Sequence, residues 1–131
     1  MWHKHLDENY FISQLYDEVP ELINTEILHI QINREGEKLT IKFLMPKYAD
    51  NPPKKWKLLD NNSVVVELDF YGVEELSLTY NSKEFLSGDI KIESNDNGLF
   101  AVNISGTVDV SFKSDTVYIQ FVKGIIVETL E

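Results

Sequence analysis

Carboxylates and histidines are the side chains of this sequence whose types and spacing could do chemistry. Adjacent acids stand at Asp7-Glu8, Asp17-Glu18 and Glu74-Glu75. A glycosidase needs two carboxyl groups across a cleft, one as an acid and the other as a nucleophile or base. Adjacent residues of a strand point to opposite faces, so these pairs favour solvated charge. An enzyme whose carboxyl groups face each other only in the folded chain, with raised pKa values, stays open as an alternative.

The histidines offer a second kind of chemistry, metal binding or general base catalysis. His3 and His5 could bring two imidazoles to one side, but a closed metal site needs further ligands. His29 falls on the outward face of a predicted strand and has no recognisable nucleophile beside it in the sequence. The segment 93–98 begins like a calcium loop, but its twelfth position is Ile104 rather than an acid. The sequence therefore predicts no metal, no organic cofactor and no enzymatic activity.

The alternation of residues 64–71 predicts a strand with one apolar face. Val64, Val66, Leu68 and Phe70 fall on one side, which is expected to build the core. The opposite side carries Val65, Glu67, Asp69 and Tyr71, which predicts an acidic, outward face that ends in an aromatic.

Similar patterns predict the elements around this strand. One short helix is expected within residues 6–19, because Pro20 would end it. A β-hairpin with a Gly-containing turn is expected over residues 26–45, and an irregular loop over residues 46–55, where three prolines occur. Further strands are predicted at residues 75–80, 89–93, 99–105, 107–112 and 116–122. The fold class is mainly β: an antiparallel β-sandwich or a curled sheet or partial barrel, with one short N-terminal helix, in a single domain of residues 1–131.

Composition excludes several classes of function. The chain has 131 residues, no cysteine and a formal charge of −10, so general binding of nucleic acid is not expected. No segment approaches the roughly 20 apolar residues of a membrane-spanning helix, and the N-terminus lacks the apolar stretch of a signal peptide. A cytoplasmic location is expected. The acidity either keeps the chain soluble or steers association with a basic protein.

The order of these features resembles the immunity protein 50 family of bacterial polymorphic toxin systems. The resemblance lies in the short helix, in residues 20–27 leading into the hairpin, in residues 52–56 and in residues 64–73. It implies a cytoplasmic antidote that binds a cognate toxin and blocks its activity.

One departure from the family pattern bears on chemistry. Many members carry a segment of the type Pro-x-Phe-His-Asp-x-Glu-Val, and this chain keeps Pro20, Glu26 and an aliphatic Ile27. The His-Asp pair is replaced by Ile23 and Asn24. The departure favours a structural or binding role.

These observations lead to a hypothesis about the binding surface. Glu67, Asp69, Tyr71 and Glu74 are predicted to contact a cognate toxin that is itself basic. The main alternative is a small-ligand-binding β-barrel or carrier, which an unfilled apolar pocket would favour. Trp56, beside two prolines, is interpreted as a core cap or loop anchor.

Overall fold

The computed structural model describes residues 2–4, 6, 9–33, 38–95 and 97–128. All the predicted strands are present, and the helix α1 lies inside its predicted range, so the prediction of a mainly β fold is confirmed. The elements in chain order are α1 (Tyr10–Leu15), β1 (Thr25–Ile32), β2 (Lys38–Leu44), α2 (Lys54–Leu58), β3 (Ser63–Tyr71), β4 (Glu74–Tyr80), β5 (Ser87–Ser94), β6 (Phe100–Gly106), β7 (Val108–Ser114) and β8 (Thr116–Ile125).

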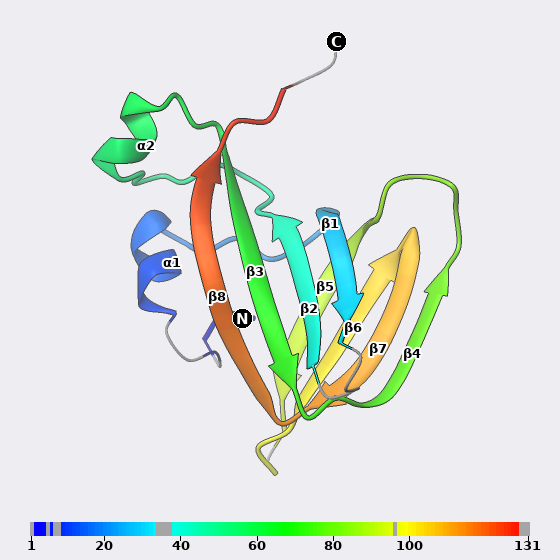
Figure 1. Ribbon diagram of the computed structural model, residues 1–131. Helices are drawn as coiled ribbons and strands as arrows, with labels where there is room; N and C mark the ends of the chain where they lie inside the picture. The colour runs from blue at the N-terminus through cyan, green and yellow to red at the C-terminus, as the bar shows by residue number, and fades with distance from the viewer. Residues whose placement is uncertain (1, 5, 7–8, 34–37, 96, 129–131) are drawn as a thin grey trace.

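The strands form one open antiparallel sheet in the order β4-β7-β6-β5-β1-β2-β3-β8 (Figure 1). Its two halves, β4-β7-β6-β5 and β1-β2-β3-β8, are joined by a short pairing of Thr25 with Gly88 and Glu26 with Ser87, which we call the seam. The curled sheet is therefore the correct one of the two predicted architectures. Pairing of β1 with β2 confirms the hairpin, and its turn at residues 34–37 lies outside the described residues.

The hydrophobic core lies between the two halves of the curled sheet. At one level the halves meet directly, where the rings of Phe70 in β3 and Phe112 in β7 are 5.0 Å apart. Further along the sheet Trp2 lies in the core, 6.0 Å from the ring of Phe43, and its indole N–H donates to the carbonyl of Pro20 at 3.0 Å. Trp2 and Leu6, which precede α1, are thus part of the core.

The two short helices lie together beside the β3 and β8 side of the sheet (Figure 1). The second helix, α2, was not predicted, because Pro52 and Pro53 favoured a loop through residue 55. The irregular segment instead ends at Pro53, which serves as the N-cap of α2. Trp56 of α2 is buried and its ring lies 6.0 Å from that of Phe11 in α1, so its interpretation as a core cap is confirmed.

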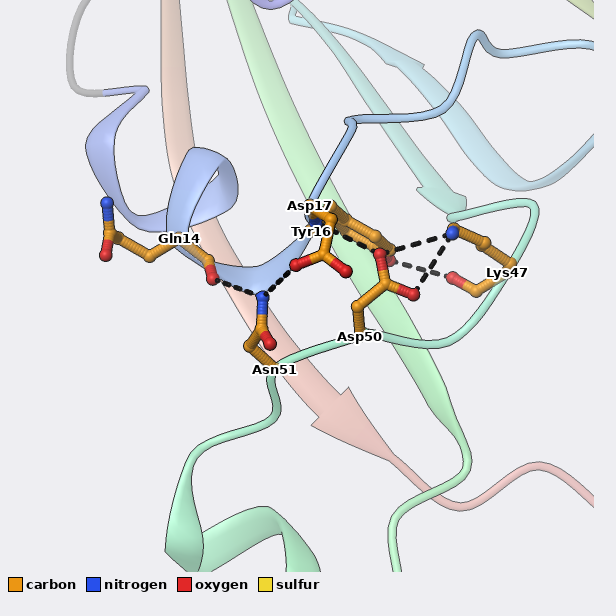
Figure 2. Close-up of polar contacts among 6 residues, drawn as sticks. All are labelled: Gln14, Tyr16, Asp17, Lys47, Asp50 and Asn51. Carbon is orange, nitrogen blue, oxygen red and sulfur yellow. Dashed lines mark hydrogen bonds and ion pairs between the residues drawn. The ribbon is translucent and has the colours of Figure 1, made fainter.

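A polar clamp fastens the loop after β2 to the end of α1 (Figure 2). The carboxylate of Asp50 accepts the backbone N–H of Asp17 at 3.0 Å and pairs with the Lys47 ammonium at 3.1 Å. The amide of Asn51 donates to the carboxylate of Asp17 at 3.0 Å and to the carbonyl of Gln14 at 3.4 Å. One ion pair and several hydrogen bonds therefore hold the loop after β2 against the end of α1.

The clamp depends on pH through the carboxyl group of Asp50. The Asp17 amide, followed by Lys47, lowers the pKa of Asp50 below its ordinary value. Because the folded pKa is the lower one, the stabilisation is present above the ordinary pKa and is lost as the pH falls through the folded pKa. Burial, followed by the charge of Asp50, raises the pKa of Tyr16, so its hydroxyl stays a donor to the carbonyl of Lys47 at 2.8 Å.

Candidate binding surface

The candidate surface is the side of β1-β2-β3-β8 that faces away from the core, which we call the outer face. The predicted alternation of β3 is confirmed, since Val64, Val66, Leu68 and Phe70 are all buried in the core. The opposite residues of β3 lie on the outer face between β2 and β8. Cross-strand pairing places these neighbours beside them: Lys38, Thr40 and Lys42 from β2, and Tyr118, Phe121 and Lys123 from β8.

Asp69 differs from the expectation, because it is not solvated. Its residue is only 2% exposed. The hydroxyl of Thr40 donates to its carboxylate at 2.6 Å, and the ammonium of Lys38 lies 3.3 Å away. The prediction of an exposed acid here is wrong, because β3 is an interior strand and side chains from β2 cover this position. A buried carboxylate is tolerated only when such partners satisfy it.

Removing the Asp69 carboxylate is expected to destabilise the fold, unlike the removal of an exposed side chain. Asp69→Ala leaves the Thr40 hydroxyl and the Lys38 ammonium without their acceptor, at a cost of about 2 kcal/mol. Asp69→Asn keeps an acceptor for Thr40 and should lose less. Urea unfolding of both variants checks this, and equal stability of Asp69→Ala and the unmodified chain would refute the structural role.

Aromatic rings and lysines are interleaved on the outer face. The rings of Tyr71 and Tyr118 meet edge to face at 5.7 Å, and the Lys38 ammonium lies 5.8 Å from the Tyr71 ring. The ammonium of Lys123 lies 4.3 Å from the centre of the Phe121 ring, within the range of cation–π attraction. The hydrogen bond and charge of Asp69 raise the pKa of Lys38. The buried carboxylate thus holds the lysine that flanks Tyr71.

Glu67, the other acid of β3 in the predicted binding surface, is half-buried on the outer face, whereas Asp69 is buried. It is the cross-strand partner of Lys42, and its carboxylate lies 3.9 Å from Nε2 of His29. With Lys38 beside Asp69, each acid of β3 therefore has a cationic neighbour. The outward side of β3 is therefore not acidic alone, because lysines of β2 lie beside its acids in the register that the sheet imposes.

Glu74 lies apart from the other three predicted residues. It begins β4, in the other half of the sheet, after the turn at Gly72, where φ is +63°. The backbone N–H of Asp115 donates to the carbonyl of Tyr71 at 3.1 Å across this corner. Tyr71 is therefore the point at which the outer face meets the corner, and Glu74 is exposed beyond it.

Phe121 is a surface residue that alternation alone places wrongly. Counting by twos from Val117 and Ile119 puts Phe121 on the core side. The register shifts within β8, so that Ile119 lies opposite Leu68 whereas Phe121 lies opposite Glu67. A β-bulge of this kind adds one residue and turns the following side chain to the other face. Tyr118, in contrast, follows the alternation.

The outward side of the other half-sheet has a different chemistry. A shallow groove over β4, β7 and β6 is lined by small polar residues that include Ser77, Thr79, Asn103 and Ser111. Residues that dominate protein interfaces are enriched in Tyr, Trp and Arg, whereas Ser and Thr are under-represented. The aromatic outer face is therefore the stronger candidate of the two.

The remaining histidines and acids that the sequence analysis considered for metal binding or catalysis do not form such a site in the described residues. His3 is buried, and burial followed by the charge of Lys4 lowers its pKa, whereas His5 and the pair Asp7-Glu8 lie outside the described residues. Among the residues that the structure describes, no group of three His, Asp or Glu side chains could hold a metal ion. The pKa of Asp50 is lowered, whereas the pKa of a carboxyl group that acts as a general acid is raised.

No helix in the described part of the chain is long and apolar enough to cross a membrane.

Fold and surface together define a small β protein with an open antiparallel sheet and an aromatic, charged outer face. Residues 8–125 match the family described as Immunity protein 50. The chain belongs to this family, as the resemblance predicted. An immunity protein of a polymorphic toxin system has a cognate toxin as its partner, and such families are typically non-enzymatic.

Comparison with other proteins adds one solved structure. The crystal structure of an uncharacterized protein from Neisseria gonorrhoeae is similar to this chain, with 13% sequence identity and a TM-score of 0.48. The similarity covers 75% of this chain and 91% of that one. No curated protein matches the sequence.

Proposed function

We propose that this chain neutralises its cognate toxin by direct protein–protein contact in the cytoplasm, through the outer face around Tyr71. Family membership supplies the toxin as the partner. The observation that carries the proposal is the edge-to-face pair of Tyr71 and Tyr118, whose rings are 5.7 Å apart. Tyr118 is 41% exposed, so part of its ring is free to meet a partner.

The arrangement around this pair supports a binding role. Asp69 holds Lys38 at 3.3 Å, and the Lys38 ammonium in turn flanks the Tyr71 ring. Side chains that are already held lose less conformational entropy on association. Tyr71 and Tyr118 then serve as anchors, and Glu67 and Glu74 belong to the polar rim. The net charge of −10 favours faster encounter with a basic toxin.

Replacing Tyr71 with alanine is the direct test of this proposal. We expect Tyr71→Ala to weaken toxin binding by about 2 kcal/mol, roughly 30-fold, mainly through faster dissociation. Glu67→Gln should mainly slow association and reduce its salt dependence, because rim charges act on encounter. The measurement is binding kinetics against the purified toxin at two salt concentrations.

Tyr10→Ala is the matched control, since Tyr10 is 74% exposed on α1, away from the outer face. It should bind the toxin as the unmodified chain does. Circular dichroism and urea unfolding separate a binding loss from a folding loss. Unchanged rates for both Tyr71→Ala and Tyr118→Ala, with the fold intact, would move the interface away from the outer face.

A further inference from the structure

The inner strand β1 loses its neighbour on one side soon after it begins. Beyond the seam, the backbone N–H of Ile27 donates to the carbonyl of Leu86 at 2.9 Å. Because β1 and β5 are antiparallel, the chain that would continue this pairing is the loop at residues 81–86, which joins β4 to β5 (Figure 1). Within the described residues, Leu28–Ile32 have no strand partner on this side. An unpaired edge is a template for another strand.

An open groove lies where the loop turns away from β1. Its volume is about 620 Å³, and Ile27 and Leu28 of β1 line it together with Tyr80, Phe85 and Leu86. Phe85 is 89% exposed and Leu28 is 43% exposed. The groove therefore combines a free backbone edge with apolar side chains. It is open to solvent, unlike the enclosed cavity that a barrel-type carrier would need.

The wall formed by the loop is held in place by its own hydrogen bonds. The hydroxyl of Thr107 donates to the carbonyl of Phe85 at 2.8 Å, and the hydroxyl of Tyr80 donates to the carbonyl of Glu84. The hydroxyl of Ser82 accepts the N–H of Glu84 at 3.0 Å. The backbone of Phe85 is thus fixed while its ring projects into solvent, which is a preorganised arrangement for contact.

We propose that this groove receives an extended segment of the cognate toxin, which adds as a strand beside Leu28–Ile32. The inference rests on the proposed function, because it takes the toxin as the bound partner. Backbone hydrogen bonds to the β1 edge would supply affinity, and alternate apolar side chains of the segment would pack on Leu28, Tyr80 and Phe85.

Charge identifies the kind of segment that fits. A second copy of this chain would also have a net charge of −10, so electrostatic repulsion disfavours self-association. Glu84 lines the groove next to Lys83, and Glu26 is exposed within the seam. Neither carboxylate forms an ion pair among the described residues. The complementary occupant is an extended toxin segment with apolar residues at alternate positions and a basic residue facing these carboxylates.

The absence of cysteine permits a site-specific test on the full chain. Phe85→Cys, labelled with an environment-sensitive fluorophore, should change its emission when purified toxin is added. Leu58→Cys is the matched control, because Leu58 is 82% exposed on α2, and its label should not respond. Hydrogen exchange should slow by about tenfold or more over Leu28–Ile32 in the complex. Phe85→Ser should weaken binding by about tenfold, and Leu58→Ser should not.

The outcomes separate this inference from the proposed function. If the unmodified chain does not bind the toxin, both are overturned. If it binds and Tyr71→Ala weakens binding, but exchange over Leu28–Ile32 and the affinity of Phe85→Ser are unchanged, only the groove proposal is overturned. Protection of Leu28–Ile32 that grows with protein concentration in the absence of toxin would assign the groove to a second copy and also overturn it.

Discussion

Phe70→Ala is expected to lower the free energy of unfolding by about 4 kcal/mol, the loss typical of a large aromatic truncated in a filled core. Phe70 is fully buried, and its ring meets that of Phe112 edge to face at 5.0 Å. The change removes this contact between the two half-sheets and leaves a cavity where they touch. Urea unfolding monitored by tryptophan fluorescence measures the effect.

Phe85→Ala is the matched control, the same substitution at a side chain that is 89% exposed. Its effect on unfolding should stay within about 0.5 kcal/mol. Phe70→Leu should recover a large part of the loss, because it refills most of the cavity. Equal losses for Phe70→Ala and Phe85→Ala would show that the contact between the half-sheets contributes little.

The second large effect is expected at Gly106, the cross-strand partner of Gly88. A β-carbon at Gly106 would lie 2.1 Å from the carbonyl oxygen of Ser87 and 2.5 Å from the α-carbon of Gly88. Both are backbone atoms of seam residues, so they cannot rotate away. Gly106→Ala is expected to cost about 3 kcal/mol, at the upper end of overpacking effects.

Gly98→Ala separates this clash from backbone strain. Gly98 has φ of +78° but open space around its missing β-carbon, so its replacement should cost only about 1 kcal/mol. Thermal unfolding of the two variants gives the comparison, and hydrogen exchange should show early opening of β1 and β5 in Gly106→Ala alone. A Gly106→Ala protein as stable as the Gly98→Ala protein would contradict the close approach at the seam.

Local alternation was sufficient to predict the strands but not their arrangement. In β3 the alternate apolar residues lie in the core, because each strand of a curled sheet has one inward side. The same rule misplaces Phe121, since the bulge in β8 depends on pairing with β3. The seam of β1 with β5 is also beyond a local pattern, because it joins Thr25 to Gly88. Helix α2 was missed because its prolines precede the first turn rather than interrupt it.

The candidate surface was predictable in location more than in chemistry. The alternation of β3 does put Glu67, Asp69 and Tyr71 on one side of the sheet. It cannot tell that Thr40 and Lys38 lie against Asp69, because these contacts join residues about thirty positions apart. Burial and charge compensation are properties of neighbouring strands, so a single strand read alone overestimates how acidic its outward side is. Whether this surface meets the toxin stays a prediction.

The pairing of β3 with β8 also has a consequence for timing. Tyr71 is synthesised before its ring partner Tyr118, and the outer face cannot be completed until translation has passed β8. Antiparallel pairing between such distant segments folds slowly compared with local structure. Under the proposed function, a newly made copy cannot neutralise the toxin through this face until folding is complete. The interval between synthesis and protection is then governed by the folding rate of the chain, and an immunity protein made at the same moment as its toxin would have to fold before the toxin becomes active.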